Sequence, residues 1–231
     1  ELQRREETHS SLHDDIIAFF NPFVKQNFKT NSKKYLEVFT MGQRSQIYVI
    51  FKDNQNRDCI SATYFQWNYG ERMISRARYL MGWIKGQNLF YSSDNNLFSL
   101  SYVAYKIRYI ASVNFDYKDV VIGQDLIEEW KAYKQGVPNA NLNDYIFYAD
   151  NNDGCLFIDA RNPKHLRYAF TTYDYKDGVM GPEAYLKWDK TPKKIQDTKF
   201  TKRNVNWITH NAKLMKKAEL EAILKTTYYT F

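Results

Sequence analysis

Residues 46–52 read QIYVIFK and residues 59–67 read CISATYFQW, two runs rich in β-branched and aromatic residues that are typical of strands. The polar residues 53–58 between them have the length of a hairpin connection. Residues 35–40 have the same strand character, so the three runs predict an antiparallel meander. A helix covering it is expected directly afterwards, because apolar residues recur at the spacing of one helix face: Met73, Ile74, Ala77, Leu80, Met81 and Ile84.

The rest of the chain predicts further elements of both kinds. Residues 11–24 have helical spacing interrupted at Pro22, so two helical pieces are expected there. Strands are predicted at residues 88–92, 97–113, 145–149, 155–159 and 166–175. Helices are predicted from residue 118 or 123 to residue 134, in a short segment after Gly181-Pro182, and over the basic residues 205–226.

These elements predict an α+β protein, in which antiparallel meanders pack against helices around an aromatic-rich core and a basic helix lies near the C-terminus. In one division, residues 1–86 form a subdomain of a helix, three strands and a helix. Residues 87–188 form a second α+β subdomain packed on the first, and residues 189–231 form a basic extension. A single mixed domain is the alternative, because no long Gly, Ser or Pro linker separates the halves.

The chain contains 5 Trp, 19 Tyr and 15 Phe among 231 residues, and two interpretations of this excess are open. The rings fill the core, or some of them form a recognition surface on which aromatic and Arg side chains concentrate binding energy. The candidate for such a surface is the start of the helix after residue 67, with Trp67, Tyr69, Arg72 and Arg76 as predicted contacts to a partner. In the alternative, Trp67 belongs to the core and Asn68 caps the helix.

The net charge of +7 is concentrated near the end of the chain. Residues 189–231 contain ten Lys and Arg against four Asp and Glu, a net charge of +6. A nucleic acid or another anionic partner is therefore expected in this region. The predicted nucleic-acid contacts are Lys193, Lys194, Lys199, Lys202, Arg203, Lys213, Lys216 and Lys217.

No motif assigns a reaction to the sequence. His9 and His13 would share one helix face, but no third ligand accompanies them, so no metal is predicted. The chain has no Gly-rich phosphate loop and no nucleophile motif, so no catalytic residue and no cofactor are predicted. An enzyme whose site is assembled across the fold stays a third possibility. Cys59 and Cys155 stand in apolar runs, which favours buried free thiols.

One segment resembles a known family. Residues 145–159 read YIFYADNNDGCLFID, a strand, an acidic turn and a strand ending in Asp. This pattern resembles the SMI1/KNR4 superfamily of bacterial immunity proteins, and the likeness extends over residues 120–188. It continues in Tyr168, Phe170, Tyr173, Tyr185, Leu186 and Trp188. The resemblance implies a protein without catalytic activity that neutralises a partner by binding it.

No run approaches the roughly 18 apolar residues that a membrane span needs, so no span is predicted and a cytoplasmic location is expected. The sequence begins at Glu1 and not at Met, so removal of an N-terminal segment stays open. The leading hypothesis is a non-catalytic protein that binds a protein partner, as an inhibitor or immunity factor. A nucleic-acid-binding protein is the main alternative.

Overall fold

The computed structural model describes residues 43–53, 55–86, 100–121, 123–139, 152–172 and 178–226. These residues belong to one compact unit, Gly42–Phe231. Their helices and strands form an α+β fold, as the sequence predicts. The elements predicted at residues 11–24, 35–40, 88–92 and 145–149 lie outside the described residues.

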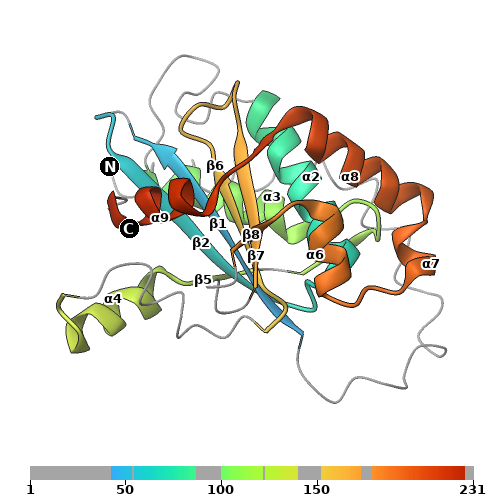
Figure 1. Ribbon diagram of the computed structural model, residues 1–231. Coiled ribbons are helices and arrows are strands. Elements are labelled where there is room, and N and C mark those ends of the chain that lie inside the picture. The colour runs from blue at the N-terminus through green and yellow to red at the C-terminus, as the bar shows by residue number, and fades with distance from the viewer. Residues whose placement is uncertain are drawn as a thin grey trace, which may run out of the picture. The chain divides into compact units, whose positions relative to one another are not determined.

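A mixed sheet lies at the centre of the fold (Figure 1). The hairpin predicted by the two strand-like runs is confirmed, since β1 (Arg44–Lys52) pairs antiparallel with β2 (Asp58–Gln66). On its other side, β1 pairs in parallel with β6 (Cys155–Asp159). The strand order is β5-β2-β1-β6-β7-β8, and β9 also pairs with β7. The outer strands are β5 (Gln124–Asp125), β7 (Arg167–Thr171), β8 (Val179–Met180) and β9 (Lys213–Leu214). One sheet therefore joins strands from either side of residue 87, and the predicted division into three parts stays a prediction.

The central strands β1 and β6 each contain an uninterrupted apolar run, because both faces of the sheet are covered there. In β1, Ile47 and Val49 belong to the core on one face, whereas Tyr48 and Ile50 belong to the core on the other. This alternation follows from the two-residue period of a strand. Strands buried on both faces lack the polar alternation of a half-exposed strand, which explains the continuous run QIYVIF.

Helices cover both faces of the sheet, so the described fold has three layers (Figure 1). The first face carries α2 (Gly70–Gly86), α3 (Leu100–Ser112), α6 (Pro182–Trp188) and α8 (Lys199–Asn211), the last preceded by the short α7 (Lys193–Gln196). The second face carries α4 (Ile127–Gly136) and α9 (Lys217–Thr226). A two-stranded hairpin, β3 (Val113–Asn114) and β4 (Asp119–Val120), follows α3.

Aromatic side chains stack in both cores, which confirms the aromatic-rich interior. Tyr48 and Phe157 stack at 4.8 Å between ring centroids on the second face, and Phe170 and Tyr185 stack at 4.9 Å on the first. The prediction that the thiols are buried and not joined by a disulfide is also confirmed, since Cys59 and Cys155 are both buried and form no disulfide with each other. Among the helices that the structure describes, none has the length and apolar character needed to cross a membrane.

The strand predicted over residues 97–113 is wrong, because α3 begins at Leu100 and ends at Ser112. Its buried residues Val103, Ile107 and Ala111 recur every four positions, which is the spacing of a helix face. Tyr105, which lies between two of them, is 39% exposed on the outer side of the helix.

The single basic helix predicted over residues 205–226 is also wrong. The structure has α8, then β9, then α9. α8 begins earlier than predicted because the Thr198 side chain caps it by accepting a hydrogen bond of 3.2 Å from the Thr201 backbone N–H. Ile208 packs in the first-face core and Met215 in the second, so the chain passes from one face of the sheet to the other between them. The helix predicted from residue 118 or 123 is shorter than expected, because residues 119–125 contain β4 and β5 and α4 begins at Ile127.

Candidate nucleic-acid interface

The predicted partner-binding residues at the start of α2 lie in unequal environments. Trp67 is 43% exposed and has a positive φ of 58°, and Tyr69 is half-buried. The Arg72 guanidinium donates a hydrogen bond to Asp119 and lies 4.6 Å from the centroid of the Tyr117 ring. Trp67 and Tyr69 are thus at the surface, whereas Arg72 is held against the β3–β4 hairpin.

Arg76 is fully buried. Its Nε donates to Asn68 Oδ1 at 3.0 Å, and its Nη1 donates at 2.8 Å to the backbone carbonyls of Ala111 and Ser112. Those carbonyls are at the C-terminal end of α3, where a helix leaves acceptors without intrahelical partners. Burial lowers the pKa of Arg76 to about 10. The side chain joins α2 to α3 and is not part of the surface that the sequence predicts.

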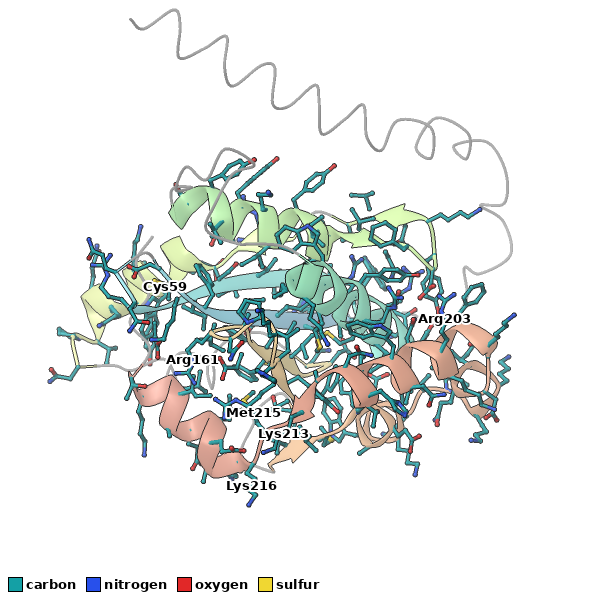
Figure 2. All side chains as sticks on the ribbon, turned by 90° about the horizontal axis from the view of Figure 1, so that it is seen from above. Cys59, Arg161, Arg203, Lys213, Met215 and Lys216 are labelled. Atoms are coloured by element: carbon teal, nitrogen blue, oxygen red, sulfur yellow. The ribbon has the colours of Figure 1, made fainter. Side chains whose placement is uncertain are left out.

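The eight cations predicted to contact nucleic acid are all exposed. They form two groups at the two ends of α8, because Arg203 lies on its first turns while Lys213 and Lys216 follow its last turn (Figure 2). Asp197 forms ion pairs with two members of the first group, Lys193 at 3.3 Å and Lys202 at 3.0 Å. These exposed pairs neutralise part of that group but hold its side chains weakly.

The exposed face of α8 connects the two groups. The exposed polar residues of α8 recur three or four positions apart and therefore share one face, and α8 contains no Asp or Glu. The opposite face, which includes Val205 and Ile208, is buried against the sheet and α2. The exposed polar side chains on this face are Lys199, Lys202, Arg203, Asn206, Thr209 and His210.

Arg203 is held on this face by a network around Asp116. The Asp116 carboxylate, whose side chain is 3% exposed, accepts hydrogen bonds from Arg203, Asn204 and Ser75. Arg203 also donates to the Tyr79 hydroxyl at 3.3 Å. The network joins α8 to α2 and to the β3–β4 turn, so the orientation of Arg203 is fixed by three elements.

An open cavity of about 580 Å³ lies at the C-terminal end of α8. We call it the basic groove. Four of its lining residues are Lys85, Lys164, Arg167 and Lys213, and two more are His165 and His210. Within the described part of the chain, no Asp or Glu lines it. A concave surface with charges of one sign concentrates counter-ions and therefore favours an anionic ligand.

Backbone pairing and one lysine contact build the groove. β9 pairs in parallel with β7, with Lys213 opposite Arg167, and the Lys213 backbone N–H donates to the Leu166 carbonyl at 2.9 Å. On the other side, Lys85 at the end of α2 donates from Nζ to the backbone oxygen and Oδ1 of Asn211, at 3.2 Å each. The ends of α2, α8 and β9 and the segment before β7 thus meet around the cavity.

Arg167 has carboxylate partners behind the groove. Its Nε donates to Asp159 Oδ2 at 3.0 Å, and its Nη1 lies 3.3 Å from Glu219 Oε1. Burial alone would raise the pKa of Asp159, but the hydrogen bonds from Arg161 and Arg167 outweigh it and hold that pKa below its ordinary value. Asp159 therefore stays ionised and fixes Arg167. Among the described residues, no carboxylate lies within ion-pair distance of the other three groove cations.

Two carboxyl groups with raised pKa values lie elsewhere, near the start of α2. Burial, supported by the nearby charges of Asp153 and Glu71, raises the pKa of Asp189 to about 7 against the opposing hydrogen bond from Thr191. Burial also raises the pKa of Asp153 to about 6, opposed by the hydrogen bond from the Arg44 backbone N–H. Within the described part of the chain, no group of three or more His, Cys, Asp or Glu side chains is arranged to hold a metal ion. The hydrogen bond from Arg44 ties Asp153, which stands just before β6, to the start of β1.

No family model matches the chain, and the searches of curated proteins and of solved structures find no similar protein. The resemblance of residues 120–188 to the SMI1/KNR4 superfamily therefore stays a prediction.

The groove itself was missed by the sequence interpretation, except for Lys213. Lys85 and Lys213 are each far in the chain from the segment that contains Lys164 and Arg167. The pairing of β9 with β7 and the contact of Lys85 with Asn211 bring these three segments together. The available signal was the basic composition of residues 161–167, RNPKHLR, which has no acidic residue.

Proposed function

We propose that the protein binds a nucleic acid along a continuous basic surface. This surface, here called the basic track, consists of the exposed face of α8 and the basic groove at its end. The observation that carries the proposal is that the groove is lined by four Lys and Arg side chains and, among the residues that the structure describes, by no carboxylate. Lysine and arginine side chains on phosphates release condensed counter-ions, and this release drives non-specific nucleic-acid binding.

The dimensions of the track support the proposal. α8 has 13 residues, which corresponds to a length of about 20 Å at 1.5 Å per residue. Successive phosphates of one strand advance about 3.4 Å along the axis of a duplex and lie further apart than this along the backbone itself, so the track has room for a few of them. Asn206 and Thr209 lie between the cations on this face and can donate further hydrogen bonds to phosphate oxygens.

The test is a binding measurement on full-length protein, using fluorescence anisotropy with labelled oligonucleotides between about 50 and 200 mM salt. We expect micromolar or tighter binding that weakens steeply with salt. The triple variant Lys85→Gln, Lys164→Gln, Lys213→Gln should bind at least about tenfold more weakly and reduce the salt slope by about 2 to 3.

The matched control is Lys131→Gln, Lys134→Gln, Lys225→Gln. It removes the same charge from exposed positions on α4 and α9, which cover the second face of the sheet. We expect this control to stay close to the wild-type affinity. An equal loss in both triple variants would mean that net charge alone governs binding, and it would refute the basic track.

A protein partner is the second candidate, and the exposed Trp67 is the observation that favours it. A Trp that is 43% exposed beside a half-buried Tyr69 is the type of side chain that anchors protein interfaces. The test is affinity purification of wild-type protein and Trp67→Ala after nuclease treatment. A partner that is lost from Trp67→Ala but retained by the groove triple variant would support this function.

A further inference from the structure

We propose that the basic track prefers single-stranded nucleic acid, and that the exposed rings of Phe200 and Phe115 stack on unpaired bases beside it. The inference rests on the proposed function and adds the class of nucleic acid. Phe200 is 53% exposed and Phe115 is 39% exposed. Their rings are therefore accessible to a ligand while the surrounding side chains hold them in place.

The two rings belong to one network of contacts with the cation Arg203. The Arg203 guanidinium lies 5.1 Å from the Phe200 ring centroid and donates to the Tyr79 hydroxyl at 3.3 Å. The Tyr79 ring in turn lies 4.6 Å from the Phe115 ring. The network thus leads from one ring to the other through Arg203 and Tyr79.

The charge around the rings matches a nucleic-acid strand. Phe200 stands between Lys199 and Lys202 on α8, and both lysines are exposed. The carboxylate of Asp116, which would repel phosphates, has a side chain that is 3% exposed and is covered by its hydrogen bonds to Ser75 and Asn204. A phosphate near the lysines would place its base within reach of a ring.

Flat rings beside cations distinguish single strands from duplexes. In a duplex the base faces are stacked on one another, so a protein ring finds only backbone and groove edges. In a single strand the base faces are available, and stacking on aromatic side chains is the usual mode of sequence-tolerant binding. The lysines would contribute to binding of both duplexes and single strands, whereas the rings would contribute only to binding of single strands.

The experiment compares a labelled single strand with the duplex of the same sequence, for wild-type protein, Phe200→Ala and Phe115→Ala. We expect each substitution to weaken single-strand binding about tenfold and to change duplex binding less than about twofold. Phe200→Trp should retain single-strand affinity. Phe200→Leu keeps an apolar side chain but removes the flat ring, so its single-strand affinity should fall almost as far as that of Phe200→Ala.

Tyr105→Ala is the matched control. Tyr105 is also 39% exposed with an arginine near its ring, since Arg108 lies 5.9 Å from the ring centroid, but it belongs to α3. α3 and α8 lie at opposite sides of α2 in the view of Figure 2. Single-strand affinity should be unchanged in this variant.

The results separate the two proposals. If Phe200→Ala and Phe115→Ala bind the single strand as wild type does, the stacking surface is refuted, whereas the basic track stands as long as the groove triple variant is impaired. Rings that serve a protein partner would give this result. If Phe200→Leu binds as well as wild type, stacking is refuted in favour of plain apolar contact. If wild-type protein binds neither oligonucleotide, both proposals fail.

Discussion

Lys213 is the register partner of Arg167 where β9 pairs in parallel with β7. Paired residues of neighbouring strands are adjacent, so two positive charges lie side by side at the basic groove. Asp159 and Glu219 bind Arg167, while among the described residues no carboxylate lies within ion-pair distance of Lys213. Glu219 interacts electrostatically with both Arg167 and Lys213 and offsets part of their repulsion, and a bound phosphate would neutralise the remainder.

We therefore expect Lys213→Gln to change stability and binding in opposite directions. Removing one of two adjacent like charges should raise the free energy of unfolding by about 0.2–0.5 kcal/mol at low salt, and the gain should disappear near 1 M salt. Urea denaturation at both salt concentrations measures this change. Nucleic-acid affinity should fall in the same variant. A lower stability at low salt would show that Lys213 is held by favourable contacts, contrary to this account.

Arg76→Met should strongly destabilise the fold. The substitution keeps an apolar stem but leaves Asn68 Oδ1 and the Ala111 and Ser112 carbonyls without their buried donor. We expect a loss of about 3 kcal/mol in the free energy of unfolding, measured by urea denaturation. The control Arg72→Met removes a partly exposed ion pair with Asp119 and should cost only about 1 kcal/mol. Equal losses would contradict the structural role assigned to Arg76.

The parts of the fold that the sequence predicts well depend on local signals. β1, β2 and α2 follow one another with short connections, and their patterns of apolar residues decide both element type and order. The residues Gly181-Pro182 predict the start of α6, since proline is favoured in the first turn of a helix. These features need no information from distant segments.

The features that sequence reasoning missed depend on distant contacts. The parallel pairing of β1 with β6 joins residues more than a hundred positions apart, and hydropathy alone does not specify it. Ile208, Ala212 and Met215 have helical spacing by coincidence, because β9 carries the chain across the sheet edge between Ile208 and Met215. Arg76 was predicted to contact a partner because it lies near the start of the helix after residue 67, and only the carbonyls at the end of α3 explain why it is buried.

Gly154→Ala should destabilise the start of β6. Gly154 has a φ of +86°, and a Cβ atom there would lie 2.4 Å from the Thr171 backbone oxygen. Neither the left-handed conformation nor a contact with backbone can be relieved by moving a side chain, so we expect a loss of about 2–4 kcal/mol. Thermal unfolding gives the comparison with Gly136→Ala, at a position where a Cβ would meet nothing within 4 Å. That control should be neutral or slightly stabilising, and similar behaviour of both variants would refute the close approach.

Stability should decrease as the pH rises from about 4 to 8, because of Asp189 and Asp153. Their folded-state pKa values, raised to about 7 and about 6, lie above the ordinary value of 3.8. Stability linked to such groups is fully present below the unfolded pKa and is lost as the pH rises through the folded pKa. Asp53 and Asp159 have lowered pKa values and act at low pH, where the stability that they contribute is lost as the pH falls below about 4. A stability maximum near pH 4–5 follows.

Asp189→Asn tests the origin of this decrease. Asn keeps an oxygen that can accept the hydrogen bond from Thr191 and never ionises, so the variant should gain about 1–2 kcal/mol in unfolding free energy at pH 8 and little at pH 4. Urea denaturation across this range measures the difference. The control Asp197→Asn removes an exposed carboxylate whose pKa is lowered by hydrogen bonds from Lys202 and Lys193, so it should leave the decrease between pH 5 and 8 unchanged. If Asp189→Asn lost stability at pH 8, the carboxylate would have to be ionised and favourably bound in the folded protein, which its burial beside Asp153 and Glu71 argues against.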